Sequence, residues 1–395
     1  VKKGPTHINI PFEEPLYDLV SELSVEPKLL LFENETYSFI LEEKFIKQWN
    51  SAKNKLILVG ELKPNSIENS IIESLANDDS VVVLTEKTSN LHHETFIDTI
   101  DTLITPFTDE DFKEFQPEIL ITFGGMVVSK RIKAFLRKYK PQEHWHIDSL
   151  RAYDTFGSLS QHFVTKPNLF LSQLLDKEKP VTSDYKITYS KINQSRKEKH
   201  SQYVNDIPFS DFKAFEFISN NLPKDIQLQV SNSSAIRYIQ LVTIDKSIEV
   251  FCNRGTSGID GSTSTAIGAA LQSDKPTICI TGDISFFYDS NALWNNYIPK
   301  NFKIIIINNS GGGIFRILPG HQETEVFNTF FETSHQLNAS HLAKMFGFNY
   351  FEVNDEKSLE NNWDNFVLHN DSPSILEIFT PEKINDKILK NYFKC

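Results

Sequence analysis

Short aliphatic segments recur along this chain, and a stretch long enough for one helix follows each of them. In the first half of the chain they lie at residues 55–60, 80–85 and 118–122, and residues 144–148 form a further predicted strand. A helical pattern at 128–139 follows a Gly-Gly pair. Short buried strands that alternate with helices are typical of a parallel sheet covered by helices on both faces. This alternation predicts a doubly wound α/β domain over residues 19–178.

The same alternation begins again in the second half of the chain. A helix predicted at 209–222 is followed by six predicted strands, at 226–230, 247–252, 276–281, 302–307, 349–353 and 374–379. Residues 176–208 separate the two series; they are polar and lack a sustained apolar period, as in a linker or an exposed connecting helix. The sequence therefore predicts a linker at 179–208 and a second doubly wound α/β domain at 209–395.

Length, charge and cysteine content restrict the class of protein. A chain of 395 residues is long enough for two domains, and its net charge of −12 argues against nucleic acid or an anionic membrane as the main partner. No apolar run reaches membrane-spanning length, so we expect no membrane insertion. The three cysteines, Cys252, Cys279 and Cys395, have neither metal-site nor disulfide spacing. These features predict a cytoplasmic protein with free thiols.

Small, polar or charged residues follow four strands of the second series at the point where each strand ends. They are residues 231–233 with Arg237 one turn later, residues 253–261, residues 282–283, and residues 308–313. Ligands of open parallel sheets bind outside the carboxyl ends of the strands. Because four strand ends carry such residues, we predict that this edge of the second sheet binds a ligand.

Two of these strand ends hold donors that suit a divalent cation. Asp283 offers a carboxylate, Asn309 an amide oxygen, and Gly311 a backbone carbonyl at a position where the chain can turn sharply. The helix predicted after Asp283 begins with free N–H groups that suit a phosphate. Either element alone is common in turns. Together at one sheet edge they predict a site for magnesium diphosphate, with manganese as the alternative metal.

The strand-end residues resemble a known signature. Gly282-Asp283 and Asn308-Asn309 are similar to the Gly-Asp-Gly and double-Asn pattern of thiamine-diphosphate enzymes, although Ile284 stands where the third Gly is usual. Longer strings are similar to one family of these enzymes, the 2-succinyl-5-enolpyruvyl-6-hydroxy-3-cyclohexene-1-carboxylate (SEPHCHC) synthases, or MenD. These strings lie at residues 4–17, 129–131, 231–233, 253–261, 282–286 and 308–315.

This resemblance implies a fold, a reaction and an assembly. The two α/β domains would be the central domain and the diphosphate-binding domain of a transferase of menaquinone biosynthesis that uses thiamine diphosphate and a metal ion. In its reaction 2-oxoglutarate would lose CO2, and the four-carbon remainder would add to the ring alkene of isochorismate. Subunits would form a homodimer or a dimer of dimers. Residues 1–18 would be the tail of a pyrimidine-binding domain carrying the glutamate that activates the cofactor, so a chain without that domain would be inactive.

The resemblance also implies which residues contact the cofactor. Asp283, Asn309 and Gly311 would hold the metal ion. Ile259 would support the bent cofactor, although an apolar residue in such a loop also serves to anchor the loop in a core. The residues expected to contact the cofactor are Ser257, Gly258, Ile259, Gly282, Asp283, Ile284, Ser285, Asn309, Gly311, Gly312, Gly313 and Ile314.

Both implied substrates are dicarboxylates, which require local cations in an acidic chain. Arg237 and Arg254 lie at strand ends, and a guanidinium can hold a carboxylate through two parallel hydrogen bonds. Together with Ile259 they are the candidate catalytic residues. Further candidates for substrate binding are Lys130 and Arg131, for which surface ion pairs are the alternative; Ser233, which also suits a helix N-cap; and Ile314, Phe315 and Leu318, which also suit core packing.

Two other functions stay open at this point. A different enzyme of the superfamily, such as a 2-oxoacid decarboxylase or an acetohydroxyacid synthase, would share the metal and cofactor residues. A catalytically inactive fragment would bind magnesium diphosphate and turn nothing over. The pair Arg237 and Arg254 favours dicarboxylates over pyruvate. The central domain has no Gly-x-Gly-x-x-Gly fingerprint, so we expect no flavin or NAD there.

Overall fold

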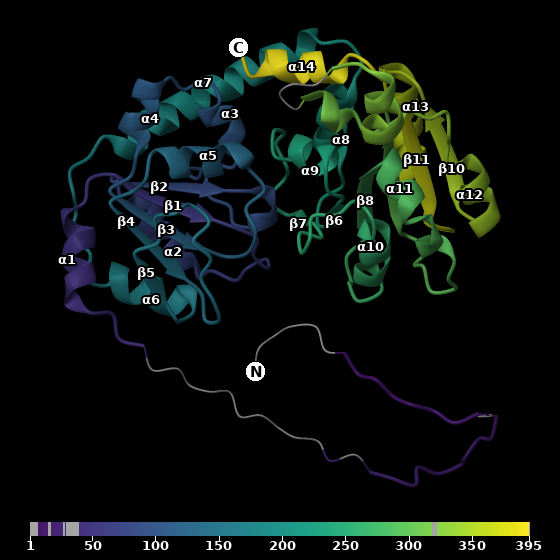
Figure 1. Ribbon diagram of the computed structural model, residues 1–395, viewed down its shortest axis with the longest axis horizontal. Coiled ribbons are helices and arrows are strands. Elements are labelled where there is room, and N and C mark those ends of the chain that lie inside the picture. Colours follow the sequence, from purple (N-terminus) through teal and green to yellow (C-terminus); the bar gives the residue numbers. More distant parts are fainter. Residues whose placement is uncertain (1–6, 15–16, 27, 29–38, 318–321, 395) are drawn as a thin grey trace.

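Two parallel β-sheets lie side by side in the computed structural model, one in each half of the chain (Figure 1). The structure describes residues 7–14, 17–26, 28, 39–317 and 322–394. The described residues before position 39 contain no helix or strand and are exposed. The expectation that residues 1–18 end a preceding domain stays a prediction, and part of that segment lies outside the described residues.

The first sheet has the strand order β2-β1-β3-β4-β5, and every neighbouring pair is parallel. Its strands are β1 (Lys55–Val59), β2 (Val81–Thr85), β3 (Ile119–Phe123), β4 (Glu143–Ile147) and β5 (Gln161–Phe163). The first three are buried along their whole length, which is why their aliphatic runs stand out in the sequence. The four predicted strands are confirmed, whereas β5 was not predicted.

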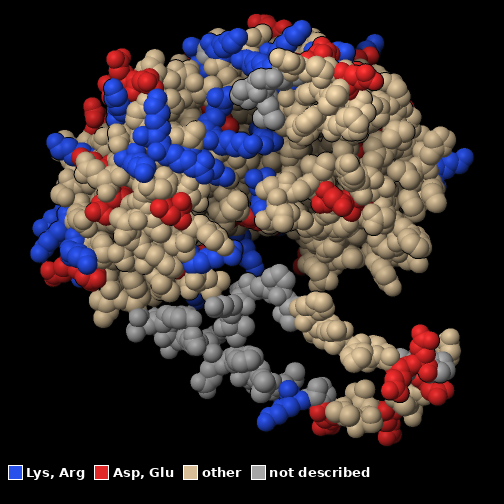
Figure 2. All heavy atoms as spheres, in the orientation of Figure 1, with Lys and Arg blue, Asp and Glu red and all other residues tan. Residues whose placement is uncertain are grey.

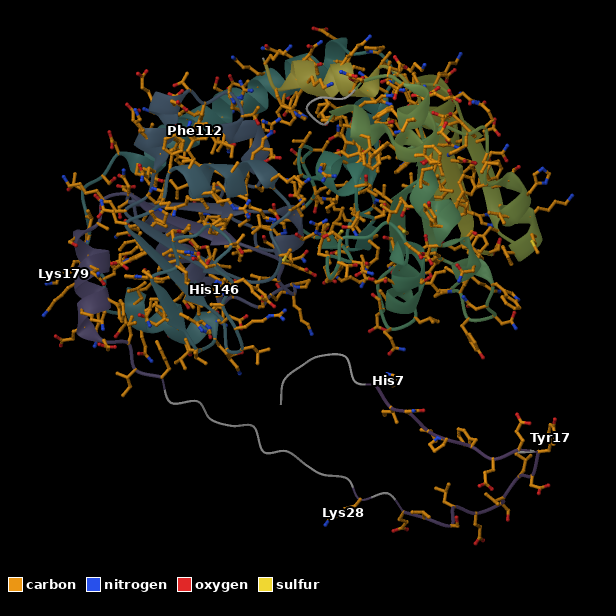
Figure 3. All side chains as sticks on the ribbon, viewed as in Figure 1. His7, Tyr17, Lys28, Phe112, His146 and Lys179 are labelled. Atoms are coloured by element: carbon orange, nitrogen blue, oxygen red, sulfur yellow. The ribbon has the colours of Figure 1, made fainter. Side chains whose placement is uncertain are left out.

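Helices cover both faces of this sheet. Ile57 and Val59 of β1 pack with α1, α2 and α6, while Leu56 and Leu58 of the same strand pack with α3, α4 and α5 on the opposite face. Figure 3 shows Phe112 at α4 and Lys179 beside α1, where the backbone N–H of Lys179 donates to Asn50. The helices are α1 (Glu43–Ser51), α2 (Asn69–Asn77), η1 (Lys87–Ser89), α3 (Ile100–Ile104), α4 (Asp109–Phe115), α5 (Lys130–Lys138) and α6 (Pro167–Leu175).

The second sheet is also entirely parallel, with the order β10-β11-β9-β8-β6-β7. Its strands are β6 (Gln227–Val230), β7 (Glu249–Phe251), β8 (Thr277–Gly282), β9 (Lys303–Asn308), β10 (Asn349–Val353) and β11 (Ser374–Phe379). All six predicted strands are confirmed, and the last two agree at both ends. The fold is therefore α/β with two doubly wound parallel sheets. Cys252 and Cys279 are buried free thiols, as predicted, and Cys395 lies outside the described residues.

Helices again lie on both faces of the second sheet. One face packs against α8, α9, α13 and α14, and the other against α10, α11 and α12. The helical elements are α8 (Asp211–Asn221), α9 (Ser234–Ile239), α10 (Ser262–Ala270), α11 (Asp283–Tyr288), η2 (Ser290–Leu293), η3 (Gly313–Ile317), the π-helix η4 (Phe327–Glu332), α12 (Ser340–Phe346), α13 (Glu356–Leu368) and α14 (Asn385–Tyr392).

A long helix joins the two halves where the sequence predicts a linker. Helix α7 (Tyr185–Asp206) takes up most of residues 179–208 and, with α14, spans both halves (Figure 1). It is not simply exposed, because Tyr185 and Tyr189 enter the core of the first half and Val204 enters the core of the second. These three apolar side chains are too widely spaced to produce an amphipathic pattern, so composition alone does not reveal the buried ends.

A short polar segment, residues 86–90, also holds the two halves together. All five of its side chains are buried. The N–H of Lys87 donates to Gln240, and the side-chain amide of Asn90 accepts from the N–H of Val250 at 2.7 Å and donates to its carbonyl at 2.9 Å. The Glu86 carboxylate accepts from the N–H groups of residues 128 and 129, at 2.6 and 2.7 Å, where α5 begins. The segment therefore fixes the start of α5 relative to both sheets.

Glu86→Gln should reduce the loss of stability that we expect between about pH 4.5 and 7. Burial raises the pKa of Glu86 from 4.5 to about 7, even though two backbone hydrogen bonds oppose the rise. The folded chain thus binds this proton more tightly than the unfolded chain, so its stabilising effect is complete below pH 4.5 and is lost as the pH passes through 7. One such proton corresponds to a slope of about 1.4 kcal/mol per pH unit. Urea unfolding at pH 5, 6 and 7 measures the free energy of unfolding of wild type and variant. If both fall equally with rising pH, Glu86 does not titrate in this range.

Candidate active site

A cavity of about 290 Å³ lies at the carboxyl edge of the second sheet. Strands β6 and β8 are neighbours, and the chain runs from β6 outward to β7 before it crosses to β8, so the strand order reverses at this point. The loops after β6, β8 and β9 form the cavity floor, and η3 and η4 close it. The predicted residues that line it are Ser233, Ile259, Gly282, Asp283, Ile284, Ser285, Asn309, Gly311, Gly312, Gly313, Ile314 and Phe315.

Asp283 is the first residue of α11, and its carboxylate is held on two sides. One oxygen, Oδ2, accepts from the N–H of Gly311 at 2.9 Å and lies 3.3 Å from Nε2 of His335. The His335 Nδ1 accepts from the N–H of Leu337, which leaves Nε2 on the side of Asp283 without a hydrogen-bond partner among the described residues. The carboxylate is almost completely buried and therefore has a fixed orientation.

The two adjacent asparagines after β9 have different roles. Asn308 uses its whole amide internally: Nδ2 donates to Glu377 and to the carbonyl of Leu337, and Oδ1 accepts from the N–H of Ser310. Asn309 donates from Nδ2 to Asp211 at 2.8 Å, whereas its Oδ1 is buried and has no hydrogen-bond partner within the described residues. A buried oxygen without a partner is rare unless a ligand uses it. Asn309 thus offers an oxygen to the cavity and Asn308 does not.

Gly311 permits the close packing of the loop that follows. Its φ is +151°, and a Cβ built there would lie 2.8 Å from the carbonyl oxygen of Glu332. Any side chain at this position would therefore push η4 away from the loop. Within the described part of the chain no group of three or more His, Cys, Asp or Glu residues is placed to hold a metal ion. A cation here would depend on one carboxylate, one amide oxygen and backbone oxygens, a donor set that suits magnesium bound to phosphate.

Asn232 organises the loop that carries Ile259. Its Nδ2 donates to the carbonyls of Asn253 and Gly258, each at 2.7 Å, and its Oδ1 accepts from Arg254 at 2.6 Å. The carbonyl of Ile259 accepts from the hydroxyl of Ser285 on α11, which ties this loop to the Asp283 helix. Of the predicted cofactor contacts, Ser257 and Gly258 lie on this loop and do not line the cavity.

A second cavity, of about 220 Å³, lies between the two halves and shares Ile314 with the first. Lys130 and Arg131 of α5 line it from one side and Arg237 of α9 from the other, so the structure brings these predicted residues together. Arg237 donates to the carbonyl of Ser233 at 2.7 Å. Leu318 lies outside the described residues.

Arg237 and Arg254 lie close enough to influence each other electrostatically. Burial lowers the pKa of Arg237, and the charge of Arg254 lowers it further. Burial raises the pKa of Glu61, in the other half, while the charge of Arg254 opposes that rise. Nε of Arg254 is buried and has no hydrogen-bond partner within the described residues. At the boundary between the halves, Arg237 and Arg254 thus offer two positive charges to an anionic ligand, and Nε of Arg254 offers a hydrogen-bond donor.

Several cavity residues were not predicted from the sequence. Asp211, Phe330 and Phe331 line the first cavity, and His335 contacts Asp283. Glu332 and Arg316 form a buried ion pair through two hydrogen bonds, which connects η4 to η3. An acidic first residue in a helix, such as Asp211, is common for reasons of helix stability alone, so its sequence context carries no signal for a ligand site.

Comparison with known proteins gives two family matches that together span most of the chain. Residues 24–230 match the family described as "Middle domain of thiamine pyrophosphate". Residues 233–378 match the family described as "Thiamine pyrophosphate enzyme, C-terminal TPP binding domain". Most residues that line the cavity lie in the second of these regions.

Individual relatives cover the whole chain. A 2-succinyl-5-enolpyruvyl-6-hydroxy-3-cyclohexene-1-carboxylate synthase of Flavobacterium johnsoniae is 64% identical over 397 residues, which is 100% of this chain and 72% of that protein. The chain belongs to the SEPHCHC synthase family. Synthases of the same name from Flavobacterium psychrophilum and Porphyromonas gingivalis are 62% and 34% identical, over 100% and 99% of this chain and 71% and 70% of their own lengths.

In SEPHCHC synthase terms, the first sheet is the middle domain and the second sheet is the C-terminal domain that binds thiamine pyrophosphate. The middle-domain match extends to residue 230, yet the structure pairs β6 with β7 and β8 of the second sheet. The structural boundary therefore precedes β6. Among the described residues, no helix is long and apolar enough to cross a membrane.

Proposed function

We propose that this chain supplies the central and cofactor-binding domains of a SEPHCHC synthase, which adds the four-carbon unit of 2-oxoglutarate to isochorismate with loss of CO2. The observation that carries the proposal is the buried, unpartnered Oδ1 of Asn309 beside Asp283 at the switch point of the second sheet. An adjoining cationic cavity supports substrates with two carboxylates.

The proposed metal ligands are Asp283 Oδ, Asn309 Oδ1 and the Gly311 carbonyl, with magnesium or manganese as the ion. Thiamine diphosphate, when bound, supplies the electron sink that makes decarboxylation of a 2-oxo acid possible. The protein binds and orients the diphosphate at the start of α11, since the N–H groups of residues 311–313 already donate to Asp283 and to the carbonyls of Glu332 and Gly311. Ile259 supports the rest of the cofactor from its loop. Phe315 and Phe331, whose rings lie edge to face at 6.0 Å, exclude water from the cavity.

The proposed substrate site uses the boundary between the halves. Arg237 and Arg254 would hold one carboxylate each, and Lys130 and Arg131 would attract the acceptor from the opposite side. Figure 2 shows Lys and Arg side chains gathered over α5 and near the boundary of the two halves, while the visible face of the second half is mainly uncharged. The remaining proposed substrate contacts are Ser233, Ile314, Phe315 and Leu318.

A homodimer is part of the proposal. Large apolar side chains of the second half are exposed, including Trp294 at 81%, Tyr297 at 74% and Phe330, which lines the cavity, at 76%. Exposed apolar groups of this size are typical of protein contact surfaces. A second subunit that covers Phe330 would complete the wall of the cavity.

The full-length protein with thiamine diphosphate and Mg2+ should release CO2 from 2-oxoglutarate and form an adduct with isochorismate, both followed by mass spectrometry. The 395-residue chain is assayed alongside it. CO2 release without an adduct would mean a 2-oxoacid decarboxylase instead. Activity of the full-length protein alone would make this chain a binding-competent but inactive part. No turnover by either would refute the proposal.

Arg254→Ala should lower kcat/KM of the full-length protein for 2-oxoglutarate or isochorismate by about 10- to 100-fold, because a hydrogen bond to a charged group contributes about 1.5–3 kcal/mol. Affinity for thiamine diphosphate should change little. Arg254→Lys is the control: it keeps the charge without the planar fork, so its loss should be smaller but measurable. Equal losses of cofactor and substrate affinity would place Arg254 at the cofactor instead.

A further inference from the structure

The carboxylate of Asp211 determines which end of the Asn309 amide faces the cavity. A carboxamide has an oxygen that accepts and a nitrogen that only donates, and a magnesium ion can use only the oxygen. Rotation by half a turn exchanges the two atoms with almost no change of shape. A site that depends on the oxygen therefore needs a partner that binds the nitrogen end.

Asp211 has the chemistry and the position for this task. An ionised carboxylate only accepts hydrogen bonds. Both of its oxygens are used: Oδ2 accepts from Asn309 Nδ2 at 2.8 Å, and Oδ1 accepts from the hydroxyl of Thr380 at 2.5 Å. With the amide nitrogen bound to Asp211, Asn309 Oδ1 is left buried and unpartnered within the described residues. Both Asp211 and Asn309 line the cavity.

The position of Asp211 is itself fixed by the fold. It is the first residue of α8, whose N-cap Ser210 accepts from the N–H of Lys213. The backbone N–H of Asp211 donates to Asn385 at 2.9 Å, and Asn385 in turn donates to the carbonyl of Pro381. The start of a helix favours a negative charge. The carboxylate is thus held in place from α8, β11 and α14, independently of the loop that carries Asn309.

We infer that Asp211 is a positioning residue that holds Asn309 with its oxygen toward the metal ion. This inference rests on the proposed function, because it assigns Asp211 to the same metal site. In this arrangement Asp211 is assigned to the amide nitrogen of Asn309 and the hydroxyl of Thr380, and not to the ion. It acts through Asn309, as the partners of metal ligands do in other sites, where their loss weakens metal affinity about 10- to 100-fold.

The test is a titration of the full-length protein with Mn2+ in the presence of thiamine diphosphate, in which free Mn2+ is counted by electron paramagnetic resonance. Asp211→Asn has the same shape but can donate as well as accept, so Asn309 is free to turn over. We expect Mn2+ affinity to fall about 10- to 100-fold. The urea midpoint should not fall, because a buried charge is replaced by a neutral group. Wild-type Mn2+ affinity in this variant would overturn the inference.

Two further variants separate orientation from a general structural effect. In an Asn309→Asp background the ligand has two equivalent oxygens, so adding Asp211→Asn should no longer weaken Mn2+ binding. Thr380→Val removes the other hydrogen bond of Asp211; it should lower the urea midpoint and leave Mn2+ affinity close to wild type. An equal loss of Mn2+ affinity in all backgrounds would mean that Asp211 only stabilises the fold. If the wild-type protein itself binds no Mn2+ with thiamine diphosphate, the proposed metal site fails rather than the role of Asp211.

Discussion

Asp283→Ala is expected to abolish metal-dependent binding of thiamine diphosphate. Asp283 supplies the carboxylate among the proposed ligands, and it also accepts the hydrogen bond from Gly311 that shapes the glycine loop. Loss of a mere partner of a metal ligand weakens affinity by about 10- to 100-fold, so loss of the charged ligand itself should exceed about 100-fold. The measurement is calorimetric titration of the full-length protein with thiamine diphosphate, with and without Mg2+.

The effect should be confined to the ligand and should not reflect unfolding. Asp283 and Asp211 repel each other, since the charge of Asp283 adds to the burial that raises the pKa of Asp211 to about 6. Removing one of these charges should therefore leave the thermal midpoint of the metal-free protein unchanged or higher. Asp260→Ala is the matched control, because Asp260 is an exposed carboxylate next to Ile259 that does not line the cavity. Equal cofactor affinity in Asp283→Ala and Asp260→Ala would contradict the assignment.

Glu332→Leu should destabilise the part of the structure that closes the cavity by about 3–5 kcal/mol, the usual effect of leaving one buried charge without its partner. The side chains of Arg316 and Glu332 are 6% and 1% exposed and are joined by two hydrogen bonds. The variant leaves the Arg316 guanidinium buried, with Glu323 at 3.3 Å as a partial substitute. Urea unfolding gives the loss of stability, and limited proteolysis should show faster cleavage within η3 and η4.

The double variant Arg316→Met with Glu332→Leu tests the physical reason. Two apolar residues of similar size need no hydrogen bonds, so most of the lost stability should return. A buried ion pair of this kind is weak evidence for stability, but its geometry makes removal of one partner severe. If the double variant were as unstable as the single one, side-chain shape rather than charge would explain the loss of stability. The hydrogen bond from the N–H of Gly312 to the carbonyl of Glu332 would then be the next contact to test.

The strands could be predicted from the sequence wherever burial on both faces demanded an unbroken aliphatic run. β9 and β11 lie inside the second sheet and were predicted within one residue. β5 was missed because its residues, Gln161–Phe163, are Gln, His and Phe and form no aliphatic run, which a strand at the edge of a sheet does not need. Helix α7 was predicted mainly as a linker because its contacts with the two cores are made by a few side chains near its ends.

The residues of the candidate site also fall into a group that could be predicted from the sequence and a group that could not. Asp283, Asn309 and Gly311 were predicted to share this edge because they lie at or shortly after the ends of β8 and β9, and the carboxyl ends of parallel strands meet at one edge. Asp211 and His335 were not, because they approach that edge through space, from a helix start and from an irregular segment. No local pattern distinguishes such residues from ordinary surface acids and histidines. Only the folded chain shows that they contact Asn309 and Asp283.

The carboxylate of Glu86 lies where other doubly wound sheets commonly bind a phosphate, at the start of a helix that follows a strand. Parallel sheets of this type commonly hold a nucleotide phosphate against the first N–H groups of a helix that follows a strand. Just before α5, the N–H groups of residues 128 and 129 already donate to Glu86. A phosphate that binds there would have to displace a buried carboxyl group that also belongs to the contact between the halves. In the middle domain these N–H groups are thus bound by a carboxyl group of the protein itself. This contact holds the start of α5, and therefore the backbone that carries Lys130 and Arg131.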